Sequence, residues 1–465
     1  MKTLLLFLLL FLATPLPAAQ PVPGLPDYGP DRPLPLPEVM QDHLDNGLEL
    51  WLIRRPGLPL LSLRLAVRGG TASDLPKRRG VSELLANTLA SGTRTHDARQ
   101  IAESLQALGA ELEASAGNDG ITLALTGLSE HAASLLDLLA EVATRPTFPE
   151  SEVKLAVANK LQALKASEND PDFMTDRVFY RVLFGNHPYR FSHADEAVVE
   201  GVTAEALRRL HRRRFQPGRT LLVMVGDLPV QQLRRLAERA FGSWKEEPEP
   251  MAEVPEAPLV PVTTRIQLVN RKGSVQSTLR AGRPLPPASH PDYPALMVAN
   301  TIFGGSFGSR LTRNIREEKG YTYSPRSSIA RLARGGYFSV QASVRNEVTA
   351  ATLVEIFYEL DRLATTEPEE EELRRARRYL GGIFLLRNET PSSLAVTLAA
   401  YWLKGLGVED LRAYVPRIDA VTTEQVKRVA AKYLASRRQA VVITGDRTAV
   451  REQLVPFAPL EEATP

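Results

Sequence analysis

One fixed distance relates several motifs along the chain. VTAE, which begins at Val202, corresponds to VTTE at Val421, and VMVGD, which ends at Asp227, corresponds to VITGD, which ends at Asp446. Both pairs are 219 residues apart, and a repeat at a fixed distance indicates internal duplication. The chain is therefore expected to fold as two similar units.

The same distance relates two helix starts. LLDLLAEVATRPTFPESEV contains Pro149, and LVEIFYELDRLATTEPEEEEL contains Pro368. In both, an apolar helical pattern runs into a proline that is followed by acidic residues, and these residue types favour the first turn of a helix. A new helix is therefore predicted after each proline.

The apolar patterns predict the same mixture of elements in each unit. LSLRLAVRG, ITLALTGL and TLLVMVGD in the first unit, and FSVQASV and AVVITGD in the second, are typical of strands. Amphipathic helical patterns lie between them. We expect an α+β fold in which each unit, of about 200 residues, has a sheet with helices on one face. Two such lobes facing each other would leave a cleft between them.

Composition suggests where the units end. EEPEPMAEVPEAPLVPV, residues 246–262, is rich in Pro and Glu and has no apolar periodicity, as is typical of a linker. The predicted organisation is a signal peptide at 1–19, an N-terminal lobe at 20–245, the linker at 246–262 and a C-terminal lobe at 263–465.

The N-terminus predicts export. MKTLLLFLLLFLATPLPAAQ has one Lys, an apolar stretch and then small residues, which is the pattern of a secretory signal peptide. A retained membrane anchor is the alternative, but the apolar stretch is shorter than a span requires and is closed by prolines. With no cysteine in the chain, disulfides and lipidated cysteines are excluded. We expect a periplasmic protein without a membrane anchor after cleavage.

Charge argues against nucleic-acid binding. Lys and Arg number 57 and Asp and Glu 54, so the net charge is only +3. The one dense basic run, RRLHRRRF at 208–215, has no interleaved aromatic residues and is predicted to be the solvated end of an amphipathic helix rather than a nucleic-acid patch.

The residues of a self-contained zinc or hydrolase site are missing. The chain has neither HExxH nor HxxEH, it has no G-x-S-x-G elbow, and no two histidines are three to five residues apart. The seven histidines are His43, His96, His131, His187, His193, His211 and His290.

Three stretches of the chain carry a family resemblance: LDNGLELWLIRRPGLPLLSLRLAVRGG, GVSELLANTLASGT and DPDFMTDRVFYRVLFGNHPYRF. They resemble the M16 family of metallopeptidases, of the two-subunit bacterial and mitochondrial-processing-peptidase type. The first is similar to the family's first hairpin, the second to the helix that in active members reads G-x-x-H-x-x-E-H-x-x-x-x-G-T, and the third to the helix that leads to its H-P-Y turn. The resemblance implies a two-lobed clam-shell.

The resemblance also implies that every metal ligand has changed. The first histidine of the motif falls on Glu83, the general-base glutamate on Ala86 and the second histidine on Asn87. The third ligand, a glutamate further along, falls on Gln162 or Ala163. We expect no metal in this chain, and a helix kept for packing after its chemistry was lost.

The second unit keeps a further part of the family pattern. FGGSFGSRLTRNIREEKGYTYS resembles a segment whose arginine and tyrosine reach the zinc site of the other lobe or subunit, and these positions are Arg316 and Tyr323. The alternative is that Arg316 pairs with a neighbouring carboxylate and Tyr323 packs in the core. The resemblance implies a subunit without zinc that pairs with a zinc-bearing homologue to cleave peptides. The other possibility is a binding or scaffold protein with no peptidase role.

Overall fold

The computed structural model describes residues 37–191, 193–245, 249–457 and 459–465. The predicted signal peptide and the first three residues of the predicted linker lie outside these ranges. No helix in the described ranges has the length and apolar character needed to cross a bilayer.

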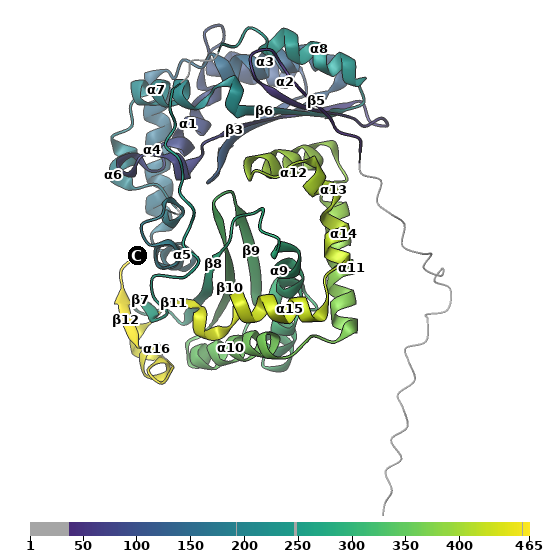
Figure 1. Ribbon diagram of the computed structural model, residues 1–465. Coiled ribbons are helices and arrows are strands. Elements are labelled where there is room, and N and C mark those ends of the chain that lie inside the picture. Colours follow the sequence, from purple (N-terminus) through teal and green to yellow (C-terminus); the bar gives the residue numbers. More distant parts are fainter. Residues whose placement is uncertain (1–36, 192, 246–248, 458) are drawn as a thin grey trace, which may run out of the picture. The chain divides into compact units, whose positions relative to one another are not determined.

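The first half of the described chain folds around one mixed sheet (Figure 1). The strand order is β1-β2-β6-β3-β5-β4. The strands are β1 (Met40–His43), β2 (Glu49–Arg54), β3 (Leu60–Arg68), β4 (Glu111–Ala116), β5 (Gly120–Leu128) and β6 (Thr220–Gly226). The helices are α1 (Val81–Thr88), α2 (Ala98–Ala107), α3 (Ala132–Thr144), α4 (Glu150–Ser167), α5 (Pro171–Phe184), α6 (Glu196–Glu200), α7 (Ala204–Arg214) and α8 (Val230–Phe241).

The second half repeats this sheet. Its strand order is β12-β7-β11-β8-β10-β9, so five consecutive strands of the two sheets correspond one to one. The strands are β7 (Ile266–Asn270), β8 (Gln276–Leu285), β9 (Arg326–Leu332), β10 (Gly335–Arg345), β11 (Ala440–Gly445) and β12 (Leu460–Ala463). The helices are α9 (Tyr293–Asn300), α10 (Thr349–Thr365), α11 (Glu370–Leu386), α12 (Pro391–Leu403), α13 (Val408–Arg412), α14 (Tyr414–Asp419), α15 (Thr423–Val429) and α16 (Arg447–Leu454). The α+β class, the two lobes and the duplication are confirmed.

The expectation of a first hairpin was wrong. The strands β2 and β3 are consecutive in sequence, but β6 lies between them, parallel to β2 and antiparallel to β3. All seven residues of β6 are buried, which is typical of a central strand. The hairpin in this region is instead β1-β2, whose turn contains Gly47 with a φ of 90°.

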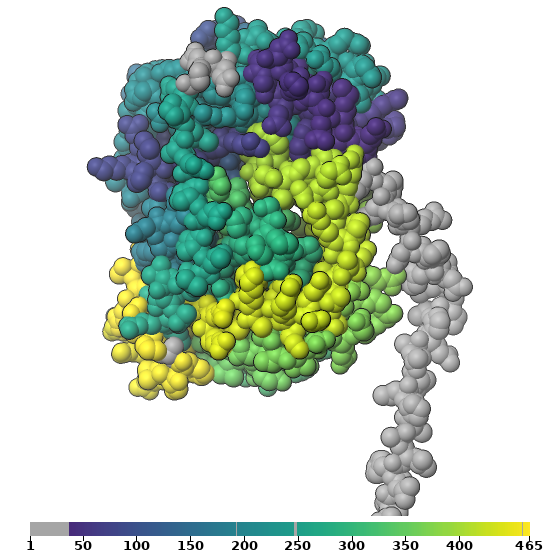
Figure 2. Space-filling view, viewed as in Figure 1, coloured from purple at the N-terminus to yellow at the C-terminus, as the bar shows by residue number. Residues whose placement is uncertain are grey.

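One helix of each lobe packs on the sheet of the other lobe. Helix α12 lies against β3 and β6 of the first sheet, and α5 lies against β8 and β11 of the second. In the space-filling view, yellow-green residues near 400 contact the purple and teal surface of the first lobe (Figure 2). We expected helices on one face of each sheet; the second face is covered as well, by the helix from the other half.

The two exchanged helices begin in the same way. In α5 the side chain of Asp170 accepts a hydrogen bond from the Phe173 N–H, and Pro171 is the first helical residue. In α12 Thr390 caps the helix and Pro391 occupies the first position. A capping side chain followed by Pro fixes a helix start locally. Their equivalent starts make α5 and α12 copies of one element.

Specific side chains hold α12 against the first sheet. The Trp402 indole N–H donates to Glu49 Oε2 (2.9 Å), and the Arg68 guanidinium lies 4.0 Å from the Trp402 ring centroid. Gly120 of β5 leaves room for Leu403, since a Cβ there would lie 2.4 Å from a Leu403 methyl group. On the second sheet, the Thr175 hydroxyl of α5 lies 2.6 Å from that of Thr444.

The basic run 208–215 is only partly solvated, contrary to our expectation. Arg214 and His211 are buried on the inner face of α7, while Arg209 and Arg212 are about half exposed. The His211 Nε2–H donates to the carbonyl of Ala143 (2.8 Å), far away in the sequence. Charge density alone does not show which side chains of such a run have buried partners.

The stability of the folded chain is expected to fall below about pH 6.5 because His211 is buried as a neutral imidazole. Burial lowers the pKa of the His211 imidazole from 6.5 to about 4, so the unfolded chain binds a proton between these values and the folded chain does not. The stabilisation by neutral His211 is fully present above pH 6.5. Roughly 3 kcal/mol of the free energy of unfolding is lost as the pH falls from 6.5 to about 4. Urea unfolding across the window, compared with His211→Gln, measures it. An identical pH profile for the variant would contradict the assignment.

Candidate functional site

Helix α1, which carries the motif positions, begins at a residue where glycine is required. Gly80 has a φ of 92°, and a Cβ there would lie 2.3 Å from the Cβ of Ala194. The Asp74 carboxylate accepts hydrogen bonds from the N–H groups of Gly80 (3.0 Å) and Ser82 (3.3 Å) and from the Ser82 hydroxyl. The start of the helix is thus held firmly although its motif side chains differ from those of active relatives.

The motif positions have three different environments. Ala86 is 1% exposed and belongs to the core of the first lobe. Asn87 is exposed to solvent, and the exposure of Glu83 is intermediate between those of Ala86 and Asn87. Leu84 and Leu85 are buried as well, so the helix contributes mainly packing.

Glu83 forms an ion pair with a lysine from α4. Lys160 Nζ lies 2.5 Å from Glu83 Oε2, and both side chains are about one quarter exposed. A partly buried carboxylate with an ammonium at this distance is already neutralised. A second cation would have to displace the lysine.

Gln162, predicted at the third ligand position, is exposed and has no described contact with Glu83. Ala163 is exposed too. The face of α4 that packs on the first core contains Val153, Val157 and Lys160, and therefore Lys160 is the residue that faces the motif.

These groups do not fit a zinc ion. Zinc sites use three or four His, Cys or carboxylate ligands, but here one carboxylate is paired with Lys160, while Ala86 offers no ligand and Asn87 only a weak one. Among the residues that the structure describes, no three His, Asp or Glu side chains come together as a metal-binding group.

A pocket of about 300 Å³ lies beside Glu83. Both lobes line it: Arg79, Glu83 and His193 come from the first half of the chain, and Leu332 and Tyr337 from the second. His193 stacks on Phe173, with ring centroids 4.1 Å apart, and its Nε2 is buried without a hydrogen-bond partner in the described part of the chain. Burial lowers the pKa of His193, so the ring favours the neutral form.

Two tyrosines close the other side of this pocket. The hydroxyl of Tyr180 on α5 lies 2.9 Å from that of Tyr337 on β10, and burial raises the pKa of both. Both phenols therefore stay protonated and bind each other. Besides these neutral groups the pocket is lined by Arg79 and by two carboxylates, Glu83 and Asp176. Each carboxylate is already paired with a cation, Glu83 with Lys160 and Asp176 with Arg280.

The H-P-Y turn joins the two halves of the chain. The Tyr189 hydroxyl donates to Asp119 Oδ1 (2.7 Å) and accepts from the Arg334 N–H (3.1 Å), and Asp119 Oδ2 accepts from the Ala333 N–H (3.0 Å). Asp119 follows β4, and Ala333 and Arg334 lie between β9 and β10. The sequence singled out the turn but gave no sign of this connection, because its partners are up to 214 residues apart.

The predicted pair Arg316 and Tyr323 lies on the surface of the second lobe. Arg316 is in the helical segment Thr312–Glu318, and its guanidinium lies 4.7 Å from the ring centroid of Phe307. Tyr323 is 85% exposed and Phe307 67%. Neither alternative from the sequence is found, since Tyr323 is outside the core and Arg316 stacks on a ring. The role of the pair at a partner's site stays a prediction.

A neighbouring arginine has the structural role instead. Arg310 is buried, with only 7% of the residue exposed, and its guanidinium donates to both carboxylate oxygens of Glu372 on α11 (2.8 and 2.6 Å). The sequence did not single it out. This fork-like pair fixes the start of the segment that presents Arg316 and Tyr323.

Two family models match these regions. The insulinase (peptidase family M16) model matches residues 52–189, and the peptidase M16 inactive-domain model matches residues 201–380, so together they span more than half of the chain. The chain belongs to the M16 peptidase family. The helix with the altered motif lies in the first match, and Arg316 and Tyr323 lie in the second.

Relatives within the M16 family include proteins with and without a peptidase description. An uncharacterized zinc protease of Streptomyces coelicolor is 25% identical, covering 87% of this chain and 89% of its own length. The non-peptidase homologue YmxG of Helicobacter pylori is 25% identical and covers 79% and 85%. A solved M16 inactive domain from Pseudomonas fluorescens aligns with a TM-score of 0.82 at 25% identity, covering 88% of this chain and 98% of that one. An M16 homologue without peptidase chemistry of its own fits these findings.

We expect the purified chain to hold no stoichiometric zinc, because Glu83, which is paired with Lys160, and Asn87 stand at the two histidine positions of the motif. Metal analysis of the dialysed protein measures this, and an HxxEH member of the family purified in parallel is the positive control. About one retained zinc per chain would contradict the prediction.

Proposed function

We propose that this chain is the subunit without zinc of a periplasmic M16-type peptidase, and that it pairs with a zinc-bearing HxxEH homologue. The homologue holds the zinc and cleaves peptides, and this chain supplies half of the chamber wall together with Arg316 and Tyr323. The N-terminal signal pattern supports the periplasmic location.

One contrast supports the proposal most strongly. The motif helix has lost its ligands and its general base, whereas the segment with Arg316 and Tyr323 keeps the family pattern, with Tyr323 exposed and Arg316 partly exposed. A guanidinium and a phenol are donors suited to a developing negative charge. Because this chain has no metal ligands of its own, such donors would act at the zinc site of another subunit.

Co-expression with the homologue tests the proposal. We expect the two full-length chains to co-purify and to cleave an unstructured peptide that neither cleaves alone. A homologue with Gln in place of the HxxEH glutamate should still bind this chain but give no cleavage, which separates assembly from chemistry.

The scaffold alternative makes a different prediction. The description of the YmxG relative as a non-peptidase homologue keeps this alternative open. A scaffold would leave the peptide turnover of the homologue unchanged, whether or not the two chains bind. Unchanged turnover in the co-purified pair would therefore count against the subunit role.

A further inference from the structure

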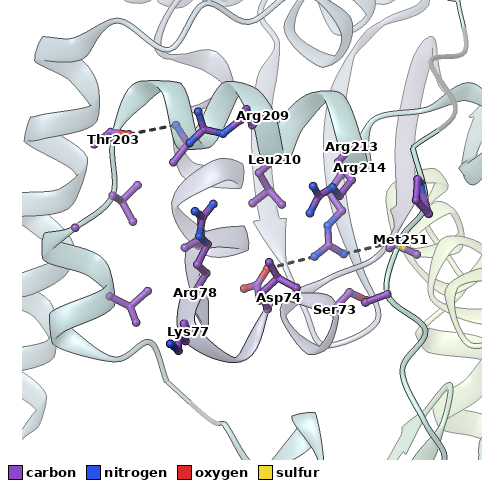
Figure 3. Close-up of a pocket in the computed structure, with 18 of the residues that line it drawn as sticks. Ser73, Asp74, Lys77, Arg78, Thr203, Arg209, Leu210, Arg213, Arg214 and Met251 are labelled. Atoms are coloured by element: carbon purple, nitrogen blue, oxygen red, sulfur yellow. Dashed lines mark hydrogen bonds and ion pairs between the residues drawn. The ribbon is translucent and has the colours of Figure 1, made fainter.

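The first lobe contains a second, larger pocket, which is lined by Asp74, by the start of the motif helix at Val81 and by residues of α6 and α7. It has a volume of about 740 Å³, within the usual range for small-molecule sites. Figure 3 shows its charged side chains coming from two sides: Lys77 and Arg78 from the turns before α1, and Arg209, Arg213 and Arg214 from α7. Met251, after the predicted start of the linker, completes the wall.

Positive charge dominates the lining. Five side chains are cationic, and Asp74 is the single acidic residue among those that line the pocket in the described part of the chain. Lys77 and Arg78 are exposed and form no ion pair with a described residue. Arg209 and Arg213 pair with Glu205 and Glu249 outside the pocket, at 3.2 and 3.1 Å, but these groups are about half exposed and such pairs exchange easily.

The buried arginine of the pocket has unused donors. Arg214 is 1% exposed, and its Nη2 lies 3.3 Å from Asp74 Oδ1. Its Nη1 donates only to the weak acceptor Sδ of Met251 (3.4 Å), and its Nε has no acceptor among the described residues. Burial lowers its pKa to about 10, so the guanidinium remains charged at neutral pH. Asp74 is already occupied by four donors and cannot neutralise the other cations.

Apart from Ser73 and Thr203, the uncharged side chains of the lining are apolar. The apolar lining residues include Val81, Val198, Val202, Ala206 and Leu210, with Met251 opposite. Apolar contact and a fixed cationic group together select a ligand with one charged end and a hydrophobic body. A planar carboxylate matches the donors of an arginine, while an inorganic anion would leave the apolar wall without a partner.

We propose that this pocket binds a carboxylate carried on an apolar body, with the charge near Arg78 and Arg209 and the body against α6 and α7. Two sources share this chemistry: the C-terminus of a peptide that ends in apolar residues, and a free fatty acid. The proposal is independent of the partner subunit and of peptide cleavage.

Calorimetric titration of the full-length chain tests this. The probes are decanoate and a tetrapeptide ending in Val-Leu, and their matched controls are decanol and the C-terminally amidated peptide. We expect at least one carboxylate to bind more tightly than about 1 mM and its uncharged control to bind at least roughly 10-fold more weakly. Which carboxylate binds identifies the source.

Two arginines of α7 provide a matched pair of variants. Arg209 lines the pocket and Arg212 does not, yet both are about half exposed and both contact Glu205. Arg209→Ala should weaken binding roughly 10-fold, the usual effect of losing a charge-assisted contact, and Arg212→Ala less than 2-fold. The melting temperature of each variant checks that α7 is intact.

The proposal would be overturned if neither carboxylate bound at about 1 mM, if the uncharged controls bound equally well, or if Arg209→Ala and Arg212→Ala weakened binding equally. Displacement of decanoate by equimolar inorganic phosphate would equally overturn it, since the apolar body would then contribute nothing.

Discussion

Arg316→Ala and Tyr323→Phe are each expected to lower peptide turnover by the assembled complex roughly 100-fold, the usual effect of removing one donor to a developing oxyanion. Assembly should be unaffected, because Tyr323 is 85% exposed and Arg316 contacts the exposed ring of Phe307 rather than a buried partner. The measurement is turnover of an unstructured peptide by the co-purified complex, together with its elution volume.

The same segment offers matched controls. Arg313 is exposed on the helical segment of Arg316, and Tyr321 packs against the second core close to Tyr323. Arg313→Ala and Tyr321→Phe should keep turnover within about 3-fold of the unmodified complex, well below the effect of losing an oxyanion donor. If Arg316→Ala and Tyr323→Phe also keep full turnover while the complex assembles normally, this chain does not complete an active site.

Asp74→Ala is expected to destabilise the chain by about 3–5 kcal/mol, because it leaves a buried guanidinium without its carboxylate. Asp74 is also the acceptor for both N–H groups at the start of α1, and those donors would lose their partner. Urea unfolding of the full chain measures the change. The exposed pair Arg239–Asp137 is the control, and Arg239→Ala should cost less than about 1 kcal/mol.

A pair of substitutions separates charge burial from packing. Replacing Asp74 and Arg214 together by apolar residues of similar size removes both charges, so the double variant should be more stable than Asp74→Ala alone. A double variant that is no more stable than Asp74→Ala would mean that the hydrogen bonds to Gly80 and Ser82, which both variants lack, account for the loss rather than the unpaired Arg214.

Local patterns in the sequence predicted five of the strands and two of the helix starts. Alternating or continuous apolar residues gave β3, β5, β6, β10 and β11, and the proline and acidic residues gave the starts of α4 and α11. These signals are local, because the spacing of apolar residues over a few consecutive positions indicates whether one or both faces of a strand are buried. The duplication was predictable for a related reason, since it needs only a comparison of the chain with itself.

Pairings between distant segments could not be predicted in this way. The insertion of β6 between β2 and β3 depends on residues about 160 positions apart, and no local pattern specifies it. Lys160 was missed because the position opposite Glu83 was placed by counting residues along the chain, whereas the facing side of α4 decides which side chain reaches across. Arg214 resembles its solvated neighbours until Asp74, 140 residues away, is brought beside it.

The reciprocal packing of α5 and α12 has a consequence for the history of the chain. Half of the molecule alone would expose one apolar sheet face and one unpacked helix, a surface that favours association with another copy. An ancestor of half the length could have covered both faces as a symmetric homodimer in which each copy donated its helix to the other. Fusing two such genes would make that association intramolecular and independent of concentration. After fusion the two halves no longer had to be identical, and each was free to change without the other.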